Sequence, residues 1–383
     1  MNRTIKIALK DFPSLPPSLC AQFSSSTLVD EVDIDLGRLF HHFYLDTQGT
    51  PPPDPDAAQF HHLSLLAATK DFRARGLGFG THAAFRGHVS NELGQAFCRW
   101  FLYEHLDVTY FAHMEHVLDR GAQEAFGNAR VERVQKGDAP DYLCAGSAGE
   151  PFIAEAKGRT SSVSFGNAEF ERWRKQFDRV VVKDGAGVER AVKGFIVATR
   201  FACEANPRVH SKLFAEDPNT RGDGPLRDDR SLIATAKTLH YSGIAAKLRQ
   251  PVLAEALATG GLVPEEIIIP GTVWELIMPP YQGRRFVGGY FPGPGGVQPI
   301  QVTDGNMVFL PENPLRLDYT SGTFFGVDEK VFRALCQAAR TGRSEGVQPL
   351  DEPTFFYSAI SFLRDGSIVG PVDFFRPQGQ VAF

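Results

Sequence analysis

The sequence is poor in cysteine and has no long apolar run. Its five cysteines are Cys20, Cys98, Cys144, Cys203 and Cys336, and no two of them form a Cys-x-x-Cys pair. Such sparse usage argues against a disulfide framework or a zinc knuckle, and it is typical of a reducing compartment. Apolar runs such as Phe195–Ala198 fall far short of the roughly 18 residues of a membrane span. Residues 1–7 also lack the apolar region of a signal peptide, so we expect a cytoplasmic protein with no membrane partner.

Positive charge is also in short supply. The 383 residues include 40 Lys and Arg against 45 Asp and Glu, for a net charge of −5. This balance excludes a uniformly basic nucleic-acid coat protein. Residues 151–200 differ from the whole chain, because they contain ten Lys and Arg and only six Asp and Glu, for a net charge of +4. A local basic surface is therefore compatible with the acidic whole.

What is present is an ordinary globular composition, with 43% hydrophobic and 22% charged residues. The length favours two to three domains. We predict an N-terminal α/β region over residues 1–87, a core over 88–203 and a C-terminal α+β domain over 231–383. Residues 204–230, rich in Asn, Asp, Gly and Pro, are predicted to be a linker loop.

Apolar periodicity predicts the main elements. Helices are expected over residues 57–75, 90–105, 167–182 and 328–340, with a further helical region over 228–258 that is broken at Pro251. Residues 108–111 and 194–199 are typical of buried strands, and residues 116–134 of a helical or irregular segment.

Acidic and basic residues gather in a stretch that is typical of a β-hairpin. Asp141–Cys144 and Phe152–Lys157 predict two strands joined by a glycine-containing turn. Side chains alternate along a strand, so Glu155 and Lys157 share one face, and Asp141 can approach them from the adjoining strand. Two carboxylates suit Mg²⁺, and a lysine beside them can orient a water or offset charge on a phosphate. Metal-assisted phosphodiester hydrolysis needs these groups.

Pro140-Asp141 followed by Glu155-Ala156-Lys157 resembles the PD-(D/E)xK nuclease superfamily, over roughly residues 88–200. The resemblance implies a restriction-endonuclease-like α/β fold. That fold has a mixed sheet flanked by helices, in the order helix, strands, helix, strand. It further implies a hydrolase that uses Mg²⁺ or Mn²⁺ to cut DNA rather than RNA, as an endo- or exonuclease that leaves a 5′-phosphate. A role in restriction or defence is compatible with it.

The resemblance also assigns residues. It implies that Asp141 and Glu155 hold the metal, helped by the backbone carbonyl of Ala156, and that Lys157 positions the attacking water. Many members carry a glutamate on the helix before the first strand, and Glu92 matches it as a catalytic residue and third metal ligand.

Arg159, Lys175 and Gln176 are the secondary candidates. Some members carry a basic or amide residue on the helix after the lysine, which Lys175 and Gln176 match, and Arg159 could meet a phosphate. Each candidate also has a structural interpretation. Glu92 would favour a helix N-terminus, Lys175 and Gln176 would form a solvated helix face, and Arg159 would lie on the surface.

Other interpretations stay open. Asp328-Glu329-Lys330 repeats the acid-x-lysine pattern without a preceding Pro-Asp, at a predicted helix start. Residues 140–157 could likewise be an exposed hairpin with an ordinary Glu–Lys pair. A non-catalytic protein could keep the fold and bind nucleic acid, a second copy or another protein through residues 231–383. An unrelated hydrolase could have its site in that C-terminal region.

Overall fold

The chain forms two compact units, Met1–Thr50 with His61–His240, and Pro51–Phe60 with Tyr241–Phe383. The structure is a computed structural model. It describes residues 2–22, 26–46, 65–118, 124–147, 151–220, 222, 230–291, 299–301, 307–309, 322–354 and 360–383. The division falls inside helix α5 (Arg230–Lys247) and not in the predicted linker.

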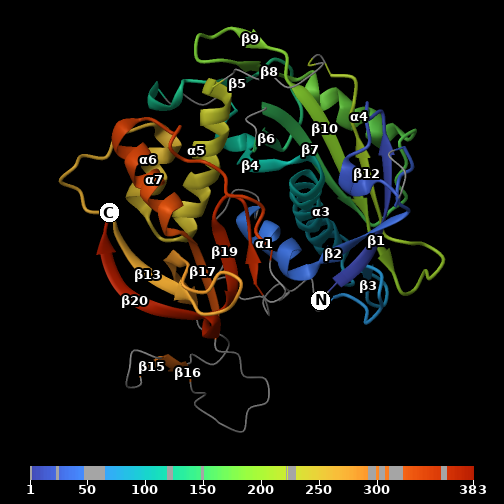
Figure 1. The fold of residues 1–383 in the computed structure, drawn as a ribbon. Coiled ribbons are helices and arrows are strands. Elements are labelled where there is room, and N and C mark those ends of the chain that lie inside the picture. Colours follow the sequence, from blue (N-terminus) through green and yellow to red (C-terminus); the bar gives the residue numbers. More distant parts are fainter. Residues whose placement is uncertain are drawn as a thin grey trace. The chain divides into compact units, whose positions relative to one another are not determined.

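A seven-stranded mixed sheet lies at the centre of the first unit (Figure 1). In spatial order its strands are β2 (Glu31–Asp35), β1 (Asn2–Lys10), β12 (Lys212–Glu216), β10 (Lys193–Arg200), β7 (Pro151–Arg159), β6 (Tyr142–Gly146) and β4 (Val108–His113). β7 runs parallel to β10 and antiparallel to β6, so the predicted hairpin is confirmed. β7 and β10 are buried along most of their length, which explains their nearly continuous apolar sequence.

Two predicted boundaries are wrong because of this sheet. β1 and β2 belong to the same sheet as the core, so residues 1–87 are not a separate region. β12 lies within the predicted linker, where it pairs in parallel with β1 and antiparallel with β10. Its central residues Leu213 and Ala215 are fully buried, whereas the residues around it are polar.

Helices cover both faces of β7. α3 (Ala83–Leu106) packs on β7 and β10, and α1 (Leu36–Asp46) packs on α3. α4 (Ala168–Phe177) lies on the other face, where the Arg159 guanidinium stands 5.4 Å from the ring centre of Trp173. Asn167 begins α4 by accepting a hydrogen bond from the backbone N–H of Phe170 at 3.0 Å.

α3 approaches β7 so closely that a side chain at residue 158 has no room. A Cβ built on Gly158 would lie 1.5 Å from the carbonyl oxygen of Ser90, and one on Gly94 would lie 2.3 Å from the backbone nitrogen of Gly158. These glycines therefore place the helix against the strand that carries Glu155 and Lys157.

We expect Gly158→Ala to lower the free energy of unfolding by about 3 kcal/mol or more, because backbone must move to admit the methyl group. Gly166→Ala is the matched control, since a Cβ there meets nothing within 4 Å. Urea unfolding of both variants measures the difference. Equal stability of the two variants would contradict this close packing.

Several predicted helices differ from the structure. The helix predicted from residue 90 begins at Ala83, and the one predicted over 167–182 ends at Phe177. β8 (Val180–Lys183) follows and pairs with β5 (Arg130–Arg133) and β9 (Glu189–Arg190). Residues 65–75 are not helical, because β3 (Arg73–Ala74) pairs with β11 (Ala202–Cys203). Residues 57–64 of that prediction lie outside the described residues.

The first unit also contains 3-10 turns. They span Pro17–Leu19, Met114–His116 and Glu124–Phe126. The last two of these turns and β5 make the described part of residues 116–134 irregular, with no α-helix.

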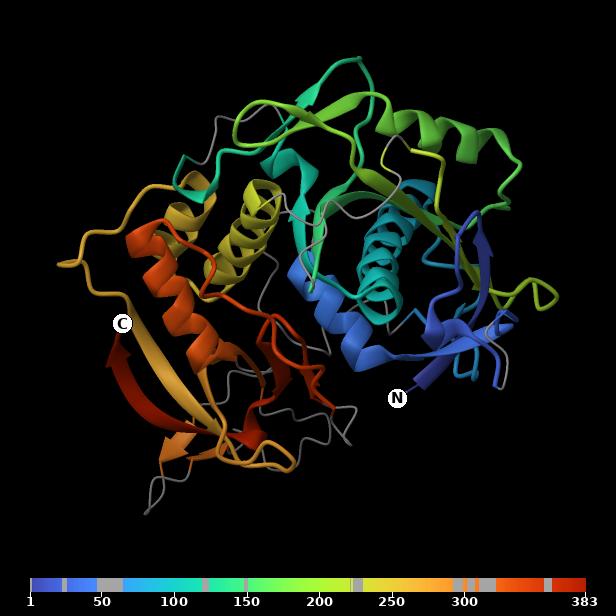
Figure 2. The same cartoon turned by 45° about the horizontal axis from the view of Figure 1, so that its top comes forward.

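The second unit is built on a separate antiparallel six-stranded sheet. In spatial order its strands are β18 (Ser361–Phe362), β19 (Ser367–Pro371), β17 (Thr323–Asp328), β14 (Arg285–Phe291), β13 (Pro270–Leu276) and β20 (Phe375–Ala382). Figure 2 shows α6 (Pro251–Thr259) and α7 (Glu329–Thr341) together on one side of β13. β15 (Pro299–Gln301) and β16 (Met307–Phe309) form a two-stranded sheet of their own. The predicted break at Pro251 is confirmed, and so is the helix predicted over 328–340, which is α7.

All five cysteines carry free thiols. Within the ranges that the structure describes, no helix has the length and apolar character needed to cross a membrane.

Candidate active site

Asp141 is fixed in place by its own backbone and side chain. It lies one residue before β6, and its N–H donates to the Ala154 carbonyl at 2.9 Å while its carbonyl accepts from the N–H of Met114 at 2.7 Å. Its carboxylate Oδ2 accepts from the backbone N–H of Ala156 at 2.7 Å. Asp141 therefore pairs with β7 through both its backbone N–H and its side-chain carboxylate, just before β6 begins.

The structure brings Asp141, Glu155 and Lys157 together. Lys157 Nζ pairs with Glu155 Oε1 and lies 3.5 Å from Asp141 Oδ2. The Glu155 side chain is fully buried, whereas those of Lys157 and Asp141 keep 18% and 21% of their surface exposed. In the parallel pairing of β7 with β10, Lys157 lies opposite Ala198. The lysine and one carboxylate thus reach solvent above a buried second carboxylate.

Burial and charge together set the protonation of this site. Burial, and then the nearby Asp141 charge, raise the pKa of the Glu155 carboxyl well above its usual value, and Lys157 only partly offsets them. Burial alone would lower the pKa of Lys157, but the two carboxylates outweigh it, and the pKa lies above its usual value. One ammonium faces two carboxylates, so the three side chains together carry more negative than positive charge.

Glu155 also has an unused acceptor. Its Oε2 atom is buried and has no hydrogen-bond partner among the described residues. A buried carboxylate oxygen without a donor is costly, so this atom would gain from a bound cation.

Glu92 lies on α3, two residues before the glycine that touches Lys157 and Gly158. Its carboxylate is 3.4 Å from the Nε2 atom of His88. Among the described residues, no three His, Cys, Asp or Glu side chains form a group that could hold a metal. Asp141 and Glu155 are therefore a pair of carboxylates, and the metal-ligand role of Glu92 stays a prediction.

The secondary candidates lie in different surroundings. Arg159 leans against α4, with its Nε 3.5 Å from Glu169. Lys175 pairs with Glu171 at 2.9 Å on the exposed face of α4, where both side chains are more than 60% exposed. Gln176 is buried on the core face, and its Oε1 has no hydrogen-bond partner among the described residues, so the expected solvated face is wrong for this residue.

A buried charged cluster next to Asp141 was missed by the sequence analysis. Tyr142 Oη donates to Asp46 Oδ1 at 2.9 Å, and Arg99 Nη1 lies 3.7 Å from the same oxygen. The Arg99 guanidinium also stacks over the Phe111 ring at 4.4 Å. The available signal was Arg99 itself, a charged residue inside an apolar stretch of α3. This cluster holds the residue that follows Asp141.

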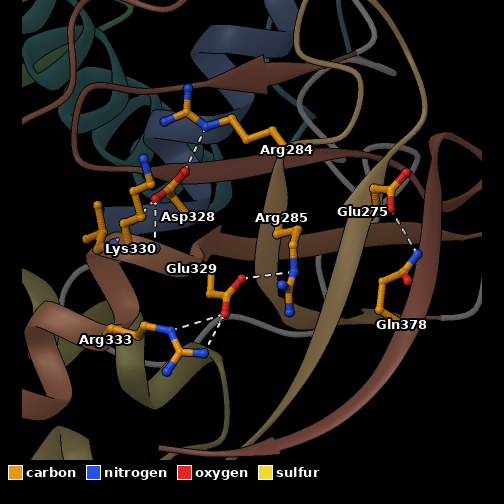
Figure 3. Close-up of polar contacts among 9 residues, drawn as sticks. Glu275, Arg284, Arg285, Asp328, Glu329, Lys330, Arg333 and Gln378 are labelled. Carbon is orange, nitrogen blue, oxygen red and sulfur yellow. Dashed lines mark hydrogen bonds and ion pairs between the residues drawn. The ribbon is translucent and has the colours of Figure 1, made fainter.

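The second acid-x-lysine pattern has a structural role, which Figure 3 shows. Asp328 begins α7 by accepting from the Lys330 N–H at 2.9 Å, and it pairs with Arg284 at 2.7 Å. Glu329 pairs with Arg285 at 3.0 Å and with Arg333 at 2.6 Å. Lys330 is exposed. The same residue pattern thus forms a helix cap in one unit and a converging acid–lysine group in the other.

Ion pairs offset much of the positive charge of residues 151–200. Arg174 pairs with the buried Glu216 at 2.9 Å, and Lys193 pairs with Asp217 at 2.7 Å. Both carboxylates belong to residues outside the segment. Arg190 pairs with Asp184 at 2.6 Å. The net charge of +4 in this segment therefore does not form an unpaired basic surface.

Comparison with family models, curated proteins and solved structures finds no match to this chain. The resemblance to PD-(D/E)xK nucleases thus rests on the residues themselves and on their arrangement.

Proposed function

We propose that the first unit is a metal-dependent nuclease that hydrolyses phosphodiester bonds of DNA. The observation that carries this proposal is the convergence of Asp141, Glu155 and Lys157 at the start of β6 and within β7. Among the strands of the central sheet and the helices that cover it, α3, β4, β6, β7, α4 and β10 occur in the order helix, strands, helix, strand, while β5, β8 and β9 between them form a separate sheet. This is the order that the PD-(D/E)xK resemblance implies. It supports assigning the first unit to that fold.

The two carboxylates fit a hard divalent cation. Mg²⁺ keeps several waters and is commonly bound through one or two carboxylates, which is the number that converges here. The buried Glu155 oxygen without a donor and the raised pKa of Glu155 both point to a group that is satisfied by a cation. Asp141 and Glu155 would hold the ion, and a bound Mg²⁺ or Mn²⁺ would supply Lewis-acid activation of water and of the phosphate.

Lys157 lies where it can contact the phosphate or the attacking water. Its ammonium lies beside both carboxylates and is partly exposed, so it can donate to a phosphate oxygen or orient a water at the site. The buried Glu155 carboxylate holds it charged, because the pKa of Lys157 is raised. Asp141 is held rigid by three hydrogen bonds to neighbouring strands and turns, which reduces the cost of orienting the site.

The direct test is cleavage of DNA by the purified protein. We expect supercoiled plasmid and linear duplex to be cut in Mg²⁺ or Mn²⁺ and to remain intact in chelator, because the carboxylate pair needs the ion to act. Gel electrophoresis measures the products. Cleavage that is insensitive to chelator would contradict a metal site at Asp141 and Glu155.

The alternative is a protein that binds nucleic acid or another protein without cutting it. Calorimetry separates the two, since the nuclease requires Mg²⁺ or Mn²⁺ binding that is lost in Asp141→Asn and Glu155→Gln. Absence of both metal binding and cleavage would favour the binding protein. The possible homodimer or partner protein at residues 231–383 stays a prediction.

A further inference from the structure

Two loops of the first unit lie beyond the carboxyl ends of β7 and β10. Residues 75–82 lead into α3, and residues 201–211 connect β10 to β12. The Gly76 carbonyl accepts from the N–H of Ala205 at 2.9 Å, and the Gly76 N–H donates to the Glu204 carboxylate at 2.6 Å. The two loops are therefore joined, and we call residues 70–90 and 201–210 together the loop surface.

The loop surface begins close to the proposed active site. The N–H of Phe201 donates to the Arg159 carbonyl at 2.8 Å, and Arg159 lies two residues beyond Lys157, about 7 Å along the strand. On α3, the Ser90 carbonyl lies against Gly158, and residue 85 is about 8 Å further along the helix. A DNA strand carries one phosphate per roughly 3.4 Å, so these distances correspond to about two nucleotides.

The loop surface is positively charged, although the whole chain is acidic. It contains five Lys and Arg against two Asp and Glu, for a net charge of +3. Arg73 pairs with Asp71 at 2.9 Å. Within the described ranges, no carboxylate pairs with the other four cations, which are Lys70, Arg75, Arg86 and Arg208. Cations without carboxylate partners favour a polyanion such as DNA.

Exposed apolar side chains lie among these cations. Leu77 keeps 78% of its surface exposed, and Phe85 keeps 48%. The Phe85 ring rests against Gly80, where a Cβ would lie 2.7 Å from the ring, so the loop holds the ring while about half of it faces solvent. Cations around an exposed aromatic ring are the combination by which proteins hold a DNA strand whose bases are unstacked.

We infer that the loop surface binds a DNA strand with unpaired bases, with its phosphates at Arg75 and Arg208 and a base stacked on Phe85. The strand would continue from there to Lys157. The inference rests on the proposed nuclease function and specifies its substrate, which is single-stranded DNA or a duplex with a single-stranded end. A blunt duplex keeps its bases stacked, so it would contact the cations without the ring.

The test is fluorescence anisotropy of labelled nucleic acid on the full chain in chelator, which prevents metal-dependent cleavage. The probes are a short oligo(dT), a blunt DNA duplex of the same length, that duplex with an oligo(dT) tail, and oligo(U). We expect oligo(dT) and the tailed duplex to bind about fivefold or more tighter than the blunt duplex. Tightest binding of the tailed duplex would identify a duplex end as the substrate, and equal binding would identify the single strand.

Two variants locate the binding. Arg75→Gln combined with Arg208→Gln should weaken binding of every DNA probe about tenfold or more. It should also reduce the slope of log affinity against log salt by about 1.4 for oligo(dT), because each phosphate contact on a single strand contributes roughly 0.7. Phe85→Ala should weaken oligo(dT) binding about fivefold or more and leave the blunt duplex unchanged, and Phe85→Trp should restore it.

The second unit supplies the matched controls. Arg343 and Ile268 are exposed there, so Arg343→Gln and Ile268→Ala should bind every probe as the wild type does. Thermal unfolding shows that each variant is folded before it is compared.

Four results would overturn the inference. They are blunt-duplex affinity equal to that of oligo(dT), tighter binding of oligo(U) than of oligo(dT), unchanged affinity in Phe85→Ala, and an unchanged salt slope in the double arginine variant. Failure of the nuclease is a separate result. Absence of Mg²⁺-dependent cleavage together with the expected binding in chelator would end the nuclease proposal and leave the DNA-binding surface in place.

Discussion

Replacing Lys157 with alanine is expected to lower the rate of Mg²⁺-dependent DNA cleavage by about a hundredfold or more. The ammonium group is the one cation beside both Asp141 and Glu155 in the described structure, at 3.5 Å from Asp141 Oδ2. Its loss would leave both a water and the phosphate charge without a donor at this position. Single-turnover cleavage of a labelled duplex measures the effect on chemistry apart from product release.

Lys330→Ala is the matched control. Lys330 ends the other acid-x-lysine pattern, but it is exposed at a helix cap, so its removal should leave the cleavage rate unchanged (Figure 3). Thermal unfolding of Lys157→Ala shows whether the variant still folds, and Lys157→Arg preserves the charge if it does not. Cleavage by a folded Lys157→Ala at the wild-type rate would remove the nuclease assignment.

Glu155→Gln is expected to change activity and stability in opposite directions. Loss of a metal-binding carboxylate should abolish cleavage and Mg²⁺ binding. In chelator at pH 8, the same variant should be more stable to urea than the wild type, because its neutral amide avoids the penalty that burial places on a charged Glu155 side chain. Lys157 keeps Asp141 as its partner in this variant.

The pH dependence follows from the direction of the pKa shift. A carboxyl whose pKa is raised in the folded state binds a proton that the unfolded chain has already released. Without metal, its stabilising effect is therefore full below the usual glutamate pKa and is lost as the pH rises through the raised pKa. Glu155→Gln should lose this slope, whereas the exposed control Glu171→Gln should keep it. Urea unfolding at pH 5 and pH 8 measures how the unfolding free energy of each variant changes with pH. An equal change in wild type and Glu155→Gln would contradict the raised pKa of Glu155.

The hairpin that carries the site could be predicted because its signals are local. Strand alternation placed Glu155 and Lys157 on one face, and the short turn made β6 and β7 neighbours. The position of Asp141 beside Glu155 and Lys157 could also be predicted from the sequence. The hydrogen bond that its carboxylate accepts from the Ala156 N–H could not.

Features that depend on distant residues could not be predicted. β12 has only five residues between polar segments, and its place in the sheet depends on β1 and β10, which lie far away in the sequence. The cluster of Arg99, Asp46 and Tyr142 joins three separate elements for the same reason. The end of α4 was misplaced because Val180 fits both the helical period and a strand, and pairing with β5 decides for the strand.

The parallel pairing of β1 with β12 also sets an order of events during synthesis. Lys10 Nζ donates to Glu216 Oε1 at 2.8 Å across a separation of 206 residues. At roughly 5 to 20 residues per second, a ribosome needs about 10 to 40 s to make that length of chain. Until then the Lys6–Lys10 part of β1 lacks its β12 partner, and its edge offers unpaired N–H and C=O groups to any extended chain nearby. The first unit should therefore depend on chaperones most strongly during this interval.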